Sequence, residues 1–181
     1  MKTLNSLTTI VICSALFSGC SFVPPKDINS TFFSPPPGST LTLKRSITIP
    51  ANDTRVRIQE GKIQPSYSAL DSYYPNCEFE LYSISEQQRV VEPDTFTITK
   101  VIRNEEVVSL PHLNKVAGIS FGGGPPLYDY QTIMEIRSNN QPDVVKLTCA
   151  QWEDSNDGQH ITIRQIRKTL GQFFELSLTK N

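Results

Sequence analysis

The chain lacks the compositional signatures of several protein classes. Its 181 residues include only 4 cysteines, 2 methionines and 2 histidines. Four cysteines are too few for a miniature scaffold that is held together mainly by disulfides. Neither charge predominates, because 17 Lys and Arg residues stand against 18 Asp and Glu residues. Nucleic-acid binding needs clustered positive charge that displaces counterions from phosphates, so we expect no nucleic-acid partner.

The chain also has no apolar run of the length that a membrane-spanning helix needs. The longest run, Leu7–Phe17, has eleven residues, whereas a helix through ~30 Å of hydrocarbon needs about 20. Lys2 precedes this run, and the small residues Ser18 and Gly19 follow it. This order of positive charge, short apolar run and small residues is typical of a secretory signal peptide. We therefore predict that residues 1–19 are a cleaved leader and that the mature chain is exported.

The end of this leader resembles the lipobox of bacterial lipoproteins. Leu16-Phe17-Ser18-Gly19-Cys20 supplies the apolar residue, the two small residues and the cysteine, although the family usually has Leu where this chain has Phe17. The resemblance covers only the leader. It implies that cleavage occurs before Cys20, whose thiol then carries a diacylglycerol and whose new amino group is acylated. Ser21 stands where Asp retains enterobacterial lipoproteins in the inner membrane. The resemblance thus implies an outer-membrane anchor with the domain facing the periplasm.

Residues 20–38 are expected to be the lipidated cysteine and a proline-rich tether. Five of the 13 prolines lie here, in Pro24-Pro25 and Pro35-Pro36-Pro37. Consecutive prolines lack backbone donors and favour an extended, semi-rigid chain, which is typical of a spacer. The adjacent Phe32 and Phe33 are unusual in a spacer, and we expect them to dock on the folded domain.

Residues 39–181 are predicted to form one β-rich periplasmic domain. Apolar and polar residues alternate with a period of two in several short segments, which turn sequences such as Asp157-Gly158 separate. This pattern predicts a mainly β fold, a small antiparallel sandwich or barrel-like sheet. Residues 103–130 are the least regular part, with a long mobile loop expected around Gly122–Pro126. The predicted inward positions are Leu41, Leu43, Ile47, Ile49, Val56, Ile58, Phe79, Leu81, Phe96, Ile98, Val145, Leu147, Cys149, Phe174, Leu176 and Leu178.

One short C-terminal helix is predicted after Thr162. Thr162 and Gln165 have the spacing of a capping box, in which each side chain satisfies a backbone donor of the other residue. Ile163, Ile166 and Leu170 then share one face, and Gly171 stands where helices often end with a positive φ. We expect this helix to cover one end of the sheet before the last strand.

The remaining cysteines predict a disulfide. Cys13 leaves with the leader, so Cys77 and Cys149 are left in strand-like segments of an exported domain, where oxidation is favoured. The alternative is a pair of buried free thiols. Trp152, three residues after Cys149, is expected in the core. No metal site or cofactor is expected, because His112 and His160 have no ligand spacing to each other or to the cysteines.

Candidates for catalysis are few. Gly118-Ile119-Ser120-Phe121-Gly122 matches the G-x-S-x-G motif of serine hydrolases. However, Gly123-Gly124-Pro125-Pro126 follows where that motif requires a helix. A carboxylate such as Glu153 or Asp154 is the other candidate for a small hydrolase.

Aromatic residues next to proline and glycine loops predict an interaction surface. Tyrosine offers apolar area and a hydroxyl at low entropic cost, which is typical of binding surfaces. The alternative is that these side chains cover the rim of a small core. Together these features favour a non-catalytic structural or protein-interaction module that docks on an unidentified envelope protein. The alternatives are a binder of a small ligand, lipid or peptidoglycan fragment, and a small periplasmic hydrolase. The candidate surface residues are Tyr73, Tyr74, Phe121, Tyr128 and Tyr130.

Overall fold

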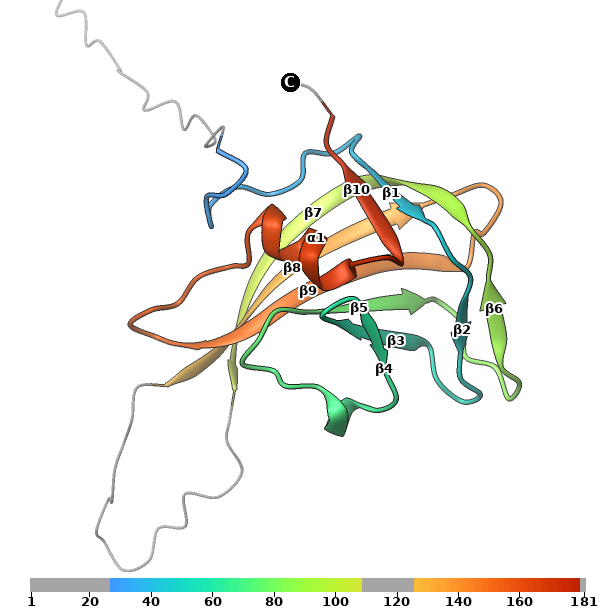
Figure 1. Ribbon diagram of the computed structural model, residues 1–181, viewed down its shortest axis with the longest axis horizontal. Helices are drawn as coiled ribbons and strands as arrows, with labels where there is room; N and C mark the ends of the chain where they lie inside the picture. The colour runs from blue at the N-terminus through green and yellow to red at the C-terminus, as the bar shows by residue number, and fades with distance from the viewer. Residues whose placement is uncertain (1–26, 109–125, 180–181) are drawn as a thin grey trace, which may run out of the picture.

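The computed structural model describes residues 27–108 and 126–179. These residues form a curled antiparallel sheet, a half-barrel, with one α-helix lying across its open side (Figure 1). The eight strands of the sheet run in the order β10-β1-β7-β8-β9-β5-β3-β4, and β2 and β6 form a separate pair. The strands are β1 (Thr40–Leu43), β2 (Ile47–Ile49), β3 (Arg55–Gln59), β4 (Lys62–Gln64), β5 (Asn76–Leu81), β6 (Arg89–Val91), β7 (Asp94–Val108), β8 (Leu127–Arg137), β9 (Val144–Asp154) and β10 (Phe174–Ser177). The helices are the 3₁₀ turn η1 (Tyr67–Ala69) and α1 (Ile163–Leu170).

Three long strands form the centre of the half-barrel. β7 pairs with β8 as far as Val108, and β8 pairs with β9 from Leu127 onward. β1 pairs with β7 only through Asp94–Thr97. The β2–β6 pair extends the β1–β7 ladder past a break and bends toward β3 at the right-hand end of Figure 1. Bending of this kind lets the sheet curl around a core instead of remaining flat.

Apolar side chains fill the concave face of the sheet. Phe79 lies at the centre, with its ring centroid 6.0 Å from that of Phe96 and 5.1 Å from that of Phe174. All three rings are buried. Burying a large apolar side chain contributes roughly 1.5–3 kcal/mol, so this cluster is a main source of stability.

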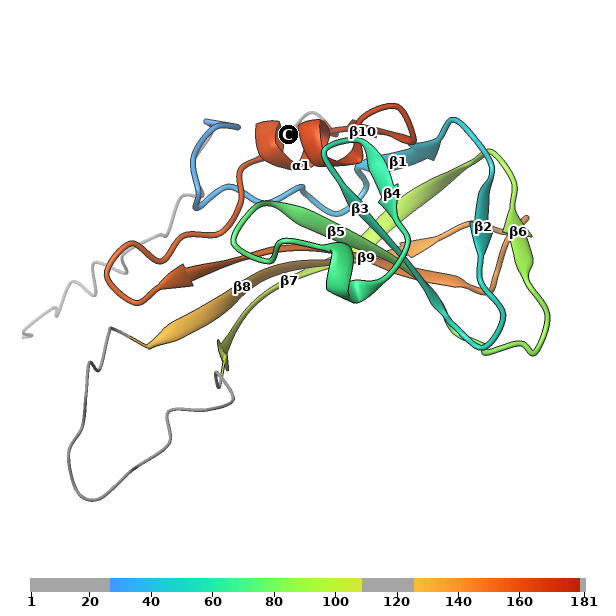
Figure 2. The same ribbon diagram turned by 60° about the horizontal axis from the view of Figure 1, so that its bottom comes forward.

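α1 covers the concave face between β10 on one side and β3 and β5 on the other (Figure 2). The capping box forms as predicted, since the Thr162 N–H donates to Gln165 Oε1 at 2.8 Å and the Gln165 N–H donates to Thr162 Oγ1 at 3.3 Å. Ile163, Ile166 and Leu170 are fully buried. The helix has only two turns, and short helices depend on tertiary packing for their stability. The sheet and the helix therefore stabilise each other.

The end of α1 is joined to the β3–β4 turn by a contact between two glycines. Gly61 and Gly171 both have positive φ, at 70° and 53°. The Gly61 N–H donates to the carbonyl of Thr169 at 2.8 Å. A Cβ at Gly171 would lie 2.4 Å from the Cα of Gly61, so the backbone at Gly61 leaves no room for a side chain at Gly171.

Part of the predicted tether packs against the sheet. Phe33 contacts the core and Pro35 is buried. The Gly38 N–H donates to the carbonyl of Ile98 at 2.8 Å, and the Ile98 N–H donates to the carbonyl of Ser39 at 2.8 Å. Residues 27–38 thus accompany β7 along the edge that β1 leaves free. Residues 20–26 lie outside the described part of the chain.

The fold prediction is confirmed: the protein is mainly β, with a barrel-like antiparallel sheet and one short C-terminal helix. Several local predictions are wrong. Residues 103–108 and 127–130 belong to β7 and β8 and are not irregular, and β4, β6 and β8 were not predicted as strands. Val144 is buried where Val145 was predicted, because the β5–β9 register shifts after Glu80 and passes over Val145. Leu178 lies just beyond β10 and is half-buried, but it packs against the core as predicted.

The Gly61–Gly171 contact predicts a specific loss of stability. Gly171→Ala is expected to reduce the free energy of unfolding by about 1–3 kcal/mol more than Gly38→Ala, because overpacking adds to the cost of a positive φ. Gly38 is the matched control, since its φ is 88° and an added Cβ would meet nothing closer than 4.0 Å. Urea denaturation of both variants measures the difference, and equal losses would contradict the contact.

Candidate interaction surface

Three exposed tyrosines lie in the connection between β4 and β5. Tyr67, Tyr73 and Tyr74 are 56%, 55% and 62% exposed. Trp152, on β9, is half-buried beside Tyr73. We call these four residues the tyrosine surface. Exposed aromatic area of this kind is enriched at protein interfaces and carries much of their binding energy.

A buried glutamine fixes the backbone of this connection. Gln59 Nε2 donates to the carbonyl of Asp71 at 2.7 Å and to that of Tyr74 at 3.3 Å. The Asp71 N–H in turn donates to Gln59 Oε1 at 3.0 Å. The Trp152 N–H donates to the carbonyl of Ser72 at 2.7 Å, which ties the same segment to β9. Tyr73 and Tyr74 therefore project from an ordered backbone, so their binding to a partner would cost little backbone entropy.

Charged side chains on the convex face support Tyr67. The guanidinium of Arg57 lies 5.6 Å from the ring centroid of Tyr67, which is a cation–π geometry. Arg57 Nε also donates to Glu78 Oε1 at 2.9 Å. Lys146 Nζ lies 3.1 Å from Glu80 Oε2 on the neighbouring strands. These exposed or half-exposed pairs contribute at most about 1 kcal/mol each, but the bond to Glu78 holds the Arg57 guanidinium that lies over the Tyr67 ring.

Trp152 contacts Tyr73 and does not lie in the core, contrary to the sequence prediction. The two ring centroids are 5.8 Å apart in an edge-to-face arrangement. Successive side chains on a strand point to opposite faces, so a residue three positions after the inward Cys149 must point outward. Trp152 is thus the member of the tyrosine surface that sequence reasoning missed, although the period of two contained the signal.

The five predicted surface residues do not gather in one place. Tyr73 and Tyr74 are exposed next to the convex face. Tyr128 and Tyr130 lie opposite Glu153 and Gln151 on β9, which puts them on the face of Cys149, and their rings are 6.1 Å apart. Tyr130 is only 7% exposed, so it belongs to the interior. Phe121 lies outside the described residues.

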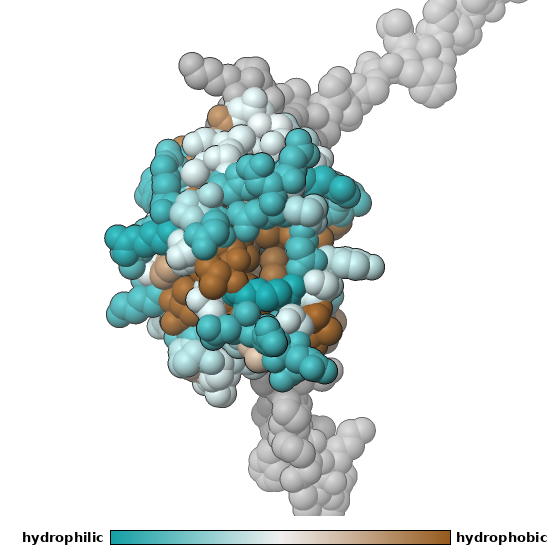
Figure 3. Space-filling view, turned by 90° about the vertical axis from the view of Figure 1, so that its right-hand side faces the viewer, coloured by the Kyte–Doolittle hydropathy of each residue, from teal (hydrophilic) through white to brown (hydrophobic). Residues whose placement is uncertain are grey.

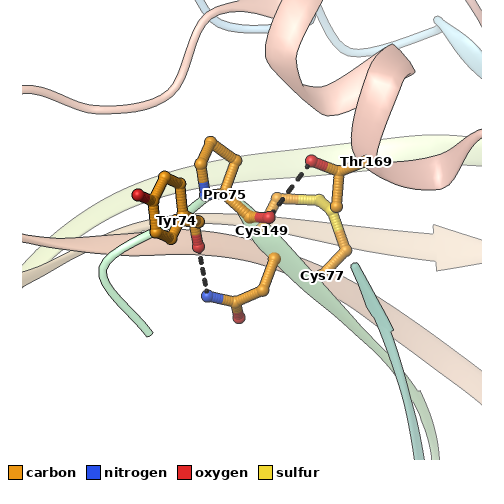
Figure 4. The surroundings of a disulfide bond; sticks show 6 residues. Tyr74, Pro75, Cys77, Cys149 and Thr169 are labelled. Carbon is orange, nitrogen blue, oxygen red and sulfur yellow. Dashed lines mark hydrogen bonds between the residues drawn. A yellow bond between two sulfur atoms is a disulfide. The ribbon is translucent and has the colours of Figure 1, made fainter. Parts of the chain in front are cut away.

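The predicted disulfide joins two directly opposed residues under α1 (Figure 4). The sulfurs of Cys77 and Cys149 are 2.08 Å apart and both residues are fully buried. Close by, the hydroxyl of Thr169 donates to the carbonyl of Pro75 at 3.4 Å. Closing a loop with a sequence separation of 72 removes unfolded-state entropy worth about 4 kcal/mol on the chain-entropy model. The disulfide also fixes β5 just where the tyrosine-bearing connection enters it.

A buried histidine lies on the concave side near the far ends of β7 and β8. His160 is 5% exposed, and its ring meets that of Tyr130 edge-on with centroids 5.5 Å apart. Its Nε2 is 3.5 Å from Glu105 Oε1, while Nδ1 is buried without a hydrogen-bond partner among the described residues. Burial and the positive charge of Arg103 hold the pKa of His160 below its usual value, although Glu105 acts in the opposite direction. The imidazole is therefore neutral at pH 7.

The carboxylates considered for catalysis make local structural contacts. Glu153 Oε1 accepts from Gln151 Nε2 at 2.9 Å, and burial followed by repulsion from Asp154 raises the pKa of Glu153. Asp154 Oδ1 accepts the N–H groups of Asn156 and Asp157 at 2.8 and 3.2 Å, which closes the turn after β9.

Cys20, His112 and Ser120 lie outside the described residues. Within residues 27–108 and 126–179, no group of three or more His, Cys, Asp or Glu side chains has the geometry of a metal site.

A second apolar area lies at the end of the molecule that carries β2 and β6 (Figure 3). Polar side chains surround it. Val90 on β6 and Ile84 in the loop before that strand are exposed. An open groove of about 320 Å³ next to the β8–β9 turn is lined by Ile136, Val144 and Val145, among others. This end lies far from the start of the described chain at residue 27, as Figures 1 and 2 both show.

Comparison with protein-family models, with curated proteins and with solved structures finds no match to this chain. The part of the chain described by the structure contains no helix that is long and apolar enough to cross a membrane.

The buried His160 predicts a specific pH dependence. The unfolded chain binds its proton with the ordinary pKa of about 6.5, whereas the folded protein has a lower pKa. Above pH ~6.5 His160 is neutral in both states and does not change the free energy of unfolding. Below that pH the unfolded chain takes up a proton that the folded protein does not. The free energy of unfolding therefore falls by up to about 1.4 kcal/mol per pH unit until the pH reaches the pKa of His160 in the folded protein. In His160→Gln this loss of stability at low pH is absent, because glutamine does not titrate.

Denaturant titrations of both proteins at pH 7.5 and pH 5.5 measure the effect. The native protein is expected to lose more stability than the variant between these pH values. The raised pKa of Glu153 contributes to both proteins and cancels in the comparison. An equal loss in the two proteins would show that His160 does not resist protonation.

Proposed function

We propose that this chain is an exported lipoprotein that acts as a non-catalytic interaction module. Acylated Cys20 would anchor it in the outer membrane, with the β domain in the periplasm. The domain would dock on an envelope protein through the tyrosine surface. The function of the module is thus to hold a partner at the membrane.

The tyrosine surface is the observation that carries this proposal. Its three exposed tyrosines present apolar rings with hydroxyl groups, which suits a surface that is wet when free and buried when bound. Gln59 and the Cys77–Cys149 disulfide hold the backbone beneath them. A rigid aromatic patch loses little conformational entropy on binding and needs no rearrangement to be recognised.

The anchor is supported by the lipobox-like Leu16-Phe17-Ser18-Gly19-Cys20. Two or three acyl chains bury enough methylene groups for lasting attachment, whereas a single chain gives only reversible binding. Attachment through Cys20 would leave the tyrosine surface in the aqueous phase, where it is available to a second protein.

The filled interior favours docking over the carriage of a lipid. A carrier in a half-barrel would use the concave face as its cavity. Here α1 occupies that face with Ile163, Ile166 and Leu170, and the rings of Phe79 and Phe174 pack beneath it. The surface of the domain is therefore the better candidate for recognition.

Site-specific photo-crosslinking in intact cells tests the proposal. A photoreactive phenylalanine analogue at Tyr73 or at Tyr74 is expected to give the same discrete protein adduct. Tyr82 is the control position, because it is even more exposed, at 83%, but follows β5 at the opposite end from Tyr74. Tyr67→Ser in the same chain is expected to weaken both adducts by several-fold.

Three outcomes would contradict the proposed docking site. These are an absence of adducts at Tyr73 and Tyr74, different adducts at the two positions, and an equal adduct at Tyr82. The anchor is tested separately, because Cys20→Ser is expected to lose acyl labelling and to leave the membrane fraction. Unchanged fractionation of that variant would exclude lipid attachment at Cys20.

A further inference from the structure

The described chain begins with an ordered turn that presents an exposed phenylalanine. The Phe33 N–H donates to the carbonyl of Ser30 at 3.1 Å, and the Phe32 N–H donates to Ser30 Oγ at 3.2 Å. Phe33 packs against the core, whereas Phe32 is 72% exposed. Ile28, in the same turn, is also exposed. The turn thus directs one aromatic ring inward and leaves two apolar side chains facing outward.

Arg103 holds this turn against the free edge of β7. Its Nη2 donates to the carbonyl of Thr31 at 2.8 Å, and its guanidinium lies 5.9 Å from the ring centroid of Phe32. These two contacts fix the position of Phe32 on the domain. An aromatic ring that is exposed to water lacks the free energy that its burial would provide. Contact with an apolar phase would supply that free energy.

The chain between Cys20 and this turn is short. Seven residue steps separate Cys20 from Asp27, and a fully extended chain spans at most 3.3–3.6 Å per step, or about 25 Å in all. If Cys20 is acylated as proposed above, its sulfur lies at the surface of the bilayer. Asp27, where the turn begins, is then held within about 25 Å of that surface, so Ile28 and Phe32 stay close to the bilayer at a high effective concentration.

We propose that Ile28 and Phe32 insert into the interfacial layer of the bilayer that holds Cys20, with Arg103 at the level of the headgroups. Phenylalanine and isoleucine gain free energy in this layer, and the long arginine side chain keeps its charge at the headgroups while its stem lies along apolar groups. The inference depends on the proposed lipid anchor and adds a second, oriented contact to it. The domain would lie against the membrane with one defined side.

This orientation leaves the tyrosine surface accessible. The turn lies beside β7, whereas η1 follows β4 at the other end of the strand order, and both ribbon views draw the two segments apart (Figures 1 and 2). The exposed Asp27 and Glu105 lie near the turn and would oppose attraction to anionic lipids. The contact is therefore apolar in origin and is expected in zwitterionic bilayers, independently of salt.

Quenching of tryptophan fluorescence by brominated lipid tests the contact. The full mature protein, purified with its acyl chains, is reconstituted into phosphatidylcholine vesicles in a Trp152→Phe background, since Trp152 is the sole tryptophan. Phe32→Trp is expected to be quenched by brominated phosphatidylcholine at least twofold more strongly than Val90→Trp, and to be protected from iodide. Val90 is the matched control, because it is exposed on β6 at the far end of the domain. Ile28→Trp is the second reporter if Phe32→Trp disturbs the turn.

Flotation of the same vesicles separates this inference from the proposed anchor. Protein that floats while Phe32→Trp and Ile28→Trp remain open to iodide and unquenched by lipid would overturn the membrane contact and leave the anchor intact. Equal quenching at Val90→Trp would also overturn it, because the contact would have no defined side. Acylated protein that fails to float would overturn both proposals. Cys20→Ser protein carrying Phe32→Trp is expected to show neither flotation nor quenching.

Discussion

The structure depends on one short helix, α1, which covers the apolar concave face of the curled sheet. Eight strands curl without closing, and the apolar residues on their concave face need a cover. α1 supplies it with Ile163, Ile166 and Leu170, although two turns of helix would not be stable alone. The Gly61–Gly171 contact and the capping box at Thr162 fix both ends of the helix over the gap. Loss of this cover would expose the apolar side chains of β3, β5 and β10 that lie beneath the helix.

The two faces of the central strands have different roles. The concave face carries the core, the Cys77–Cys149 disulfide and, farther along, the buried His160. The convex face carries ion pairs and Trp152, against which Tyr73 packs. Because side chains alternate along a strand, β9 serves both faces at once. Cys149 and Trp152 therefore lie on opposite faces of the same strand. The disulfide at Cys149 helps to fix this strand and, with it, the position of Trp152 in the tyrosine surface.

The most reliable predictions from the sequence concern features that neighbouring residues in the chain determine. The capping box of Thr162 and Gln165 and the alternation around Phe79 depend on neighbours in the chain, so both were read correctly. β8 escaped prediction because Ile133 and Met134 place apolar side chains on both faces and obscure the period of two. The buried Gln59 gave no signal, since its partners Asp71 and Tyr74 come from the fold. Tyr130 looked like a surface residue because nothing in the sequence places His160 against its ring.

The proposed role depends on Cys20, because a docking module works at a membrane only if it stays there. The same anchor would bring Ile28 and Phe32 to the bilayer and leave Tyr67 and Tyr73 facing the periplasm. Intact-mass spectrometry of the protein extracted from its native membrane tests this claim most directly. We predict a chain that starts at Cys20 and carries a diacylglycerol and an amide-linked acyl chain. A chain that retains Met1, or one that starts at residue 20 without added lipid mass, would contradict the account.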